Sequence, residues 1–203
     1  MKKVILSLAL LAGAASAANA QEGVKFGIRG GISAISLSGD DDKVSGLKTS
    51  DYSYGLGGLG GITANFAISD LVSVQPELLY NLKGTQVKEN GKDSKVRLDL
   101  HYVDLPILLK VKTEGLYFEA GPQVGYLISA KFGGTSKATI DTENLQQLSL
   151  GYVAGLGYQL TSGLNLGVRF NGGISSVGKD NGIFDQQRNQ VFSFLVGYEF
   201  GNK

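Results

Sequence analysis

The stretch that decides the fold is residues 148–171, LSLGYVAGLGYQLTSGLNLGVRFN. Most even-numbered positions up to Leu160 are apolar, and the same period resumes at Leu164. A period of two places these side chains on one face of an extended strand, whereas a helix needs a period near 3.6. Residues 161–163, Thr-Ser-Gly, have the composition of a tight turn. The stretch therefore predicts two strands joined directly by a short turn.

The same alternation recurs along most of the chain. It predicts eight strands, at residues 24–33, 62–68, 72–83, 96–112, 116–129, 150–160, 164–171 and 192–200. Within 96–112 the apolar residues change parity, so we expect a β-bulge near residues 101–103. Because no segment of useful length has helical periodicity, the fold class is all-β.

The connections between the predicted strands alternate strictly between short and long. Short turns fall at 69–71, 112–115 and 161–163, and long polar segments at about 38–53, 84–95, 132–147 and 175–190. In an up-and-down barrel, alternate connections lie at opposite ends, and outer-membrane barrels have short turns in the periplasm and long loops outside. The pattern predicts an eight-stranded antiparallel up-and-down transmembrane β-barrel.

The N-terminus has the features of an export signal. Lys2 and Lys3 precede the apolar run VILSLALLAGAA, and Ala18-Asn19-Ala20 fits a small-x-small cleavage site. We expect residues 1–20 to be a cleaved secretory signal peptide and residues 21–203 to form the barrel domain. Removing two of the 19 basic residues leaves 17 against 18 acidic ones, a balance that argues against nucleic acid as a partner.

A glycine-rich segment, YGLGGLGG at 54–61, contains the spacing G-x-G-x-x-G of dinucleotide sites. That chemistry needs a buried strand before the glycines and a helix after them. Here the loop-like TSDYS precedes and the alternating ITANFAI follows, so the context is missing. We interpret Gly55, Gly57 and Gly61 as wall positions that relieve crowding inside a narrow barrel.

The polar face of the predicted strands carries four basic and four acidic residues. They are Lys25, Arg29, Lys110, Arg169, Glu77, Asp104, Glu119 and Glu199. Eight strands enclose a lumen only wide enough for side chains, and an unpaired charge away from water is costly. We therefore expect a structural ion-pair cluster in the lumen, with a selective conduit or small-ligand site as the alternative.

No catalytic, cofactor-binding or metal-binding residues are expected, and we predict that the protein is not an enzyme. The chain has no cysteine, and its single histidine, His101, has no nucleophile motif beside it. Asp40, Asp41 and Asp42 in the first long loop lack the spacing of a calcium loop, so a solvated acidic loop is favoured over a cation site.

Three stretches, YVDLPILLKVK, GLYFEAGPQVGYLISAK and LSLGYVAGLGYQL, resemble the porin-family outer-membrane β-barrel proteins of Gram-negative bacteria. The matching positions are Tyr102, Asp104, Pro106, Lys110, Ala120, Gly121 and Pro122. The resemblance covers nearly the whole mature chain and implies an eight-stranded barrel in the outer membrane. It implies outer-membrane lipid as the surroundings and the barrel-assembly machinery as a partner during insertion. The chain departs from the family at its end, where Phe200 is followed by Gly-Asn-Lys instead of ending the chain.

The expected function is a barrel with a side-chain-filled lumen that anchors four extracellular loops for structural or surface-interaction roles, their ligand unknown. One alternative is a narrow porin for small solutes. Another is a soluble, periplasmic, lipocalin-like barrel whose apolar face points inward around a ligand. The loop asymmetry and the uncharged Leu, Val and Phe face on all eight strands favour contact with lipid. On this interpretation Phe66 faces hydrocarbon near the midplane.

Overall fold

The computed structural model describes residues 24–38, 52–53, 55–88, 95–133, 138–139, 147–175 and 188–201. Eight long strands form the fold: β1 Val24–Ser38, β3 Gly55–Ala67, β4 Val72–Lys88, β5 Lys95–Thr113, β6 Leu116–Gly133, β8 Leu148–Gln159, β9 Leu164–Gly173 and β10 Arg188–Glu199. Two further strands, β2 Tyr52–Ser53 and β7 Ala138–Thr139, have two residues each. Within these ranges no helix is long and apolar enough to cross a membrane.

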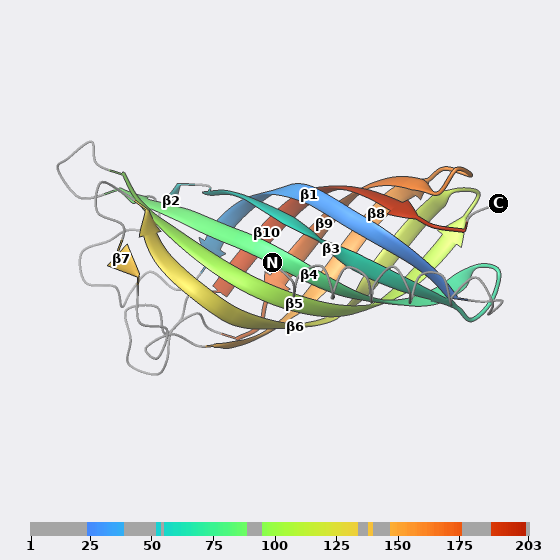
Figure 1. The fold of residues 1–203 in the computed structure, drawn as a ribbon, viewed down its shortest axis with the longest axis horizontal. Helices are drawn as coiled ribbons and strands as arrows, with labels where there is room; N and C mark the ends of the chain where they lie inside the picture. The colour runs from blue at the N-terminus through green and yellow to red at the C-terminus, as the bar shows by residue number, and fades with distance from the viewer. Residues whose placement is uncertain are drawn as a thin grey trace, which may run out of the picture.

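The sheet closes on itself. Each long strand pairs antiparallel with its neighbour in sequence, and β1 pairs with β10 to complete the ring (Figure 1). The predicted eight-stranded antiparallel up-and-down barrel is therefore confirmed. Because closure pairs the edge strands, the backbone N–H and C=O groups of β1 and β10 bond to each other and not to solvent.

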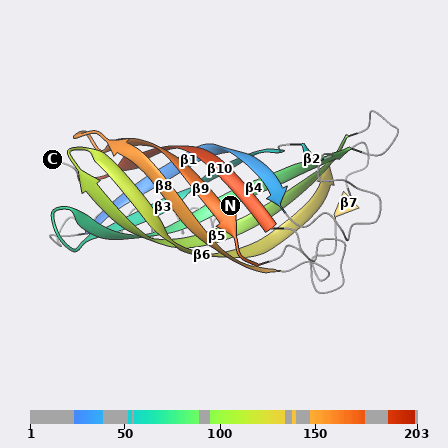
Figure 2. The same cartoon turned by 180° about the vertical axis from the view of Figure 1, so that it is seen from behind.

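The two ends of the barrel differ as predicted. Turns at 68–71, 114–115 and 160–163 join the strands at the end where β1 begins and β10 finishes (Figure 2). Glycine permits the left-handed backbone in two of them, with φ of 93° at both Gly115 and Gly163. In outer-membrane barrels the end with short turns faces the periplasm, and we expect the same orientation for this end.

The opposite end corrects the predicted loop boundaries. Part of the segment 84–95, expected to be a loop, is strand, because β4 continues to Lys88 and β5 begins at Lys95. β2 pairs with this extension of β4, and β7 pairs with the end of β6. Most of the other three long connections, including the acidic residues 40–42 and the motif residue Tyr54, lie outside the described residues, as does the predicted signal peptide.

The faces of the strands separate apolar from ionic side chains. Phe194, Leu150 and Tyr126 point outward and are 51%, 45% and 48% exposed, whereas Asp104 and Arg169 point inward and are 0% and 1% exposed. A lipocalin-like barrel would have the reverse arrangement, so that alternative is wrong. Tyr80, Tyr126, Tyr152 and Tyr198 also lie on the outward face.

The expected β-bulge occurs at the predicted height but in the neighbouring strand. The β5–β6 register shifts between His101 and Tyr102, whose partners are Ser129 and Leu127. The unpaired extra residue is thus Ile128 of β6. In β5, Leu100, Tyr102 and Asp104 are all buried on the inner face, so the apolar residues there change parity because the lumen itself contains apolar side chains.

The glycine-rich segment is a strand wall, as interpreted. The whole of 55–61 belongs to β3, although the alternating pattern indicated a start only at residue 62. A Cβ atom on Gly57 or Gly61 would overlap the backbone carbonyl oxygens of Leu82 and Leu78, respectively. These two positions therefore require glycine for close approach of β3 and β4.

The three prolines of the chain lie side by side in adjacent strands. Pro76 of β4 faces Ile107 beside Pro106 of β5, and Pro106 faces Gln123 beside Pro122 of β6. Proline donates no backbone hydrogen bond, and each of these two strand pairings is interrupted for two residues beside it. Because the barrel is closed, all three prolines lie in strands that are paired on both sides.

Phe66 is not near the midplane, contrary to the expectation from sequence. It is the second-last residue of β3 and pairs with Val24 and Val74 at the turn end. Phe194 is the seventh of twelve residues in β10, pairs with Ile32 and Val168, and marks the middle of the outward band.

This depth difference gives a matched pair of variants. Phe194→Arg should lower the free energy of unfolding in lipid vesicles by about 2–4 kcal/mol, because a cation near the bilayer midplane is poorly solvated. Phe66→Arg should cost about 0–1 kcal/mol, because its guanidinium reaches the interface. Urea titration of the refolded proteins measures both, and equal losses would contradict the assigned depths.

Candidate functional site: the ionic lumen

The centre of the lumen holds four ionic side chains from four strands. Arg29 of β1 and Arg169 of β9 meet Glu77 of β4 and Glu119 of β6. Arg29 Nη1 lies 2.6 Å from Glu77 Oε1 and 3.2 Å from Glu119 Oε2. Arg169 Nη1 lies 2.7 Å from Glu77 Oε2, and its Nε donates to Glu119 Oε1 at 2.8 Å. Each arginine thus bridges both glutamates across the barrel.

This central cluster is fully removed from solvent. All four side chains are 2% exposed or less. Gln75 Nε2 donates a further hydrogen bond to Glu77 Oε1 at 2.6 Å. Arginine is suited to this role because its planar guanidinium donates to two carboxylates in a fixed geometry. The charges of the cluster cancel, two against two.

A second ion pair lies toward the long-loop end. Lys83 Nζ of β4 is 3.0 Å from Asp104 Oδ2 of β5, and Asn81 donates to the same oxygen at 2.6 Å. The Lys83 ammonium also lies 4.3 Å from the centre of the Tyr102 ring. Lys83 was not among the eight predicted cluster residues, although its position on the polar face of its strand indicated that it points inward.

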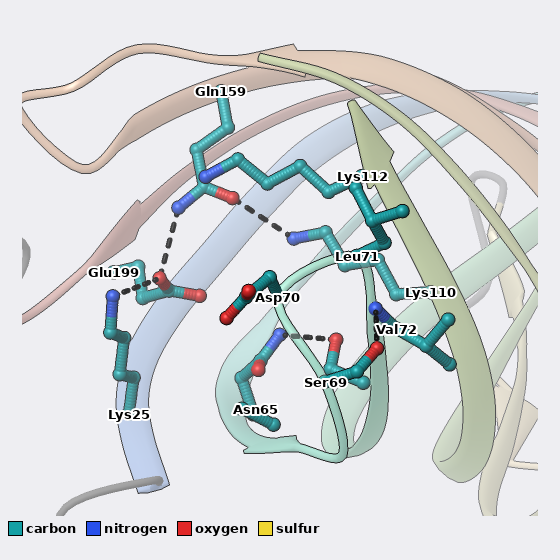
Figure 3. A pocket seen from close by; sticks show the side chains of 12 residues that line it. Lys25, Asn65, Ser69, Asp70, Leu71, Val72, Lys110, Lys112, Gln159 and Glu199 are labelled. Atoms are coloured by element: carbon teal, nitrogen blue, oxygen red, sulfur yellow. Dashed lines mark hydrogen bonds and ion pairs between the residues drawn. The ribbon is translucent and has the colours of Figure 1, made fainter. Parts of the chain in front are cut away.

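The third group lies at the periplasmic mouth. Lys25 Nζ is 3.9 Å from Glu199 Oε1, but the Lys25 side chain is 46% exposed and lies at the rim. Gln159 links this pair to Lys110: it donates to Glu199 Oε1 at 2.9 Å and accepts from Lys110 Nζ at 3.2 Å. These contacts are drawn in Figure 3. Lys110, also expected in the cluster, contacts amide oxygens, and no carboxylate of the described residues forms an ion pair with it.

Apolar side chains share the inner surface with the ionic groups. Leu79, Leu108, Tyr117, Val153 and Leu195 are each 2% exposed or less. From the alternation, glycine and ionic residues were expected on this face. The signal that was overlooked is parity: Leu79 falls on the same parity as Glu77 and Asn81 in β4, and Leu108 on that of Asp104 and Lys110 in β5.

His101 lies on the outer surface of β5, away from the ionic lumen. Its Nδ1 is 2.5 Å from the hydroxyl of Tyr80, and the two rings are tilted at 43°. Within the described ranges no group of three or more His, Cys, Asp or Glu side chains is arranged to hold a metal ion. The acidic triplet 40–42, weighed as a cation site, is outside those ranges.

Comparison with known proteins places this architecture in a family. The sequence profile described as "Outer membrane protein beta-barrel domain" matches residues 17–178, which is most of the chain. The chain belongs to this family of outer-membrane β-barrel domains. The predicted localisation in the outer membrane is thereby confirmed, as is the resemblance to Gram-negative outer-membrane barrels. A sequence comparison with curated proteins found no significant match.

Solved structures share the fold at low sequence identity. Neisserial surface protein A superposes with a TM-score of 0.55 at 18% identity, over 88% of this chain and 100% of that one. Ail, the attachment invasion locus protein of Yersinia pestis, superposes with a TM-score of 0.50 at 16% identity, over 89% and 100%. That Ail crystal contains the heparin analogue sucrose octasulfate. At such identities the likeness establishes the fold alone.

The central cluster predicts a strong dependence of stability on Arg169. In Arg169→Gln, Glu77 and Glu119 would share only Arg29, and breaking a buried ion pair on one side costs about 3–5 kcal/mol. Lys25→Gln is the control, because an exposed pair contributes about 0–1 kcal/mol. Urea unfolding of both variants in the same lipid makes the comparison, and a loss below 1 kcal/mol for Arg169→Gln would contradict the assigned geometry.

Proposed function

We propose that this outer-membrane barrel is a closed scaffold: its lumen is occluded by the Arg29–Glu77–Arg169–Glu119 cluster, and its four long connections carry its contacts at the cell surface. The observation that supports it is the pair of arginines, each bridging both glutamates at 3.2 Å or less. Opening a path would require separating these charges in a lumen with little water, which is costly.

The proposal assigns the protein a structural or surface-interaction role and no catalysis, cofactor or metal. Its surroundings are outer-membrane lipid, and its partner during insertion is the barrel-assembly machinery. The apolar outward face supports contact with lipid, since hydrocarbon accepts such side chains without cost.

Planar-bilayer conductance distinguishes the scaffold from the narrow porin. The refolded wild-type protein should give no discrete current steps, because the buried ion pairs leave no continuous water path. The double variant Arg169→Ser/Glu119→Ser removes one charge of each sign and two large side chains, and should give resolvable steps. A matched double variant at the rim, Lys25→Ser/Glu199→Ser, should stay silent.

Two outcomes would overturn the scaffold proposal. Discrete steps from wild-type protein, at the same frequency as from the double variant, would establish a conducting barrel and favour the porin. Steps from the rim variant but not from the central one would mean that the barrier lies at the periplasmic mouth. Heat-modifiable migration on gels serves as the folding control for every variant.

A further inference from the structure

A pocket lined by both polar and apolar side chains opens at the short-turn end of the barrel, which we call the periplasmic mouth. It has a volume of about 140 Å³ and is lined from β1, β3, β4, β5, β8 and β10 together with the 68–71 turn. Figure 3 shows Lys25, Lys110, Lys112 and Gln159 extending into the same space. A cavity of only ~10–15 Å³ holds one water molecule. This pocket therefore accommodates a molecule of several heavy atoms.

The ionic groups farther inside the barrel are matched, and Lys110 is the exception. Arg29 and Arg169 meet two glutamates, and Lys83 meets Asp104. Across the described residues, in contrast, no carboxylate lies within 4.0 Å of Lys110 Nζ. Lys110 is nevertheless buried, with 2% of its surface exposed. A buried ammonium without a counter-charge is an unfavourable arrangement unless an anion joins it.

The hydrogen bonds of Lys110 leave one donor for such an anion. An ammonium carries three N–H groups. Two reach Gln159 Oε1 at 3.2 Å and Gln75 Oε1 at 3.4 Å, while the Tyr117 ring lies 4.3 Å from the nitrogen. The third has no oxygen or nitrogen acceptor among the residues that the structure describes, and the ammonium otherwise lies over the Tyr117 ring, which attracts a cation but carries no charge. Both amides therefore hold the ammonium in place without neutralising it.

The surrounding charges favour a negatively charged occupant. The pocket lining includes three lysines, Lys25, Lys110 and Lys112, against two carboxylates, Asp70 and Glu199. Glu199 is already engaged by Lys25 and by Gln159. One net positive charge remains in the lining, and it is partly shielded from water, which strengthens its attraction for an anion.

We propose that the periplasmic mouth binds a small oxyanion of the phosphate or carboxylate type, with Lys110 as the direct contact and Lys112 as a second cation. The occupant would supply the counter-charge that Lys110 lacks. Because it binds the folded barrel only, it would also stabilise the fold in proportion to its concentration. This site is on the opposite side of the central cluster from the surface connections and is independent of the proposed scaffold role.

The test uses the full-length mature protein in phospholipid nanodiscs, with inorganic phosphate as the probe. Titration at constant ionic strength against chloride should produce saturable shifts in the side-chain amide NMR signals of Gln159 and Gln75. Lys110→Met should weaken binding at least tenfold, and Lys112→Gln severalfold. Lys131→Met, at an exposed lysine near the opposite end of β6, is the control and should bind as the wild type does.

Three results would overturn this proposal: shifts that do not saturate, equal shifts with chloride, or wild-type affinity in Lys110→Met. If Lys110→Met fails to fold, Lys112→Gln together with phosphate-dependent urea stability of the wild type decides the question. In that case no increase in stability with phosphate would refute the site. Since none of these readouts uses current, a conducting wild type would refute the scaffold and leave this test unaffected.

Discussion

The pairing of β1 with β10 is the constraint on which the rest of the structure depends. Hydrocarbon offers no hydrogen-bond partner, so a sheet that crosses the membrane must satisfy every backbone group internally. The twelve register pairs from Gly27–Glu199 to Ser38–Arg188 do this by joining the first and last long strands. Closure with eight strands then sets a narrow lumen, and the narrow lumen decides which side chains it can contain.

The ionic lumen follows from that narrowness. Side chains from opposite walls meet, so Arg29 of β1 and Arg169 of β9 reach glutamates on β4 and β6. Where large groups crowd the interior, the wall is glycine: a Cβ on Gly157 would overlap the ring of Tyr117. Buried ion pairs add little net stability compared with apolar packing, but separating them is costly. That asymmetry suits a barrel that stays closed.

The sequence predicted the faces of the strands well because alternation is a local property. Strand count, antiparallel topology, the short-turn end and the inward direction of Arg29, Glu77, Glu119 and Arg169 all follow from parity and turn composition. What parity cannot predict is height, because the stagger between strands is set by barrel closure. This is why Phe66 was placed too deep, and why Lys83 was not recognised as the partner of Asp104.

Parity also misleads where the inner face is apolar. Three large residues of β5 point inward: Leu100, Tyr102 and Leu108. Their parity predicted a bulge in β5, whereas the extra residue is Ile128 of β6. The extension of β4 and β5 beyond the barrel was missed because its polar residues have turn-like composition. In this extension β4 pairs with β5 and also with β2. Amino-acid composition does not predict such pairing.

The central claim is that apolar side chains face lipid while the alternate ones fill a sealed lumen. The chain has no cysteine, so single cysteines in β10 can carry spin labels without background. Collision rates with lipid-soluble oxygen should be high for labels at Phe192, Phe194 and Val196. At Ser193 and Leu195, collisions should be low with both oxygen and a water-soluble nickel complex. High oxygen access at Ser193 and Leu195, with low access at Phe194, would contradict the account.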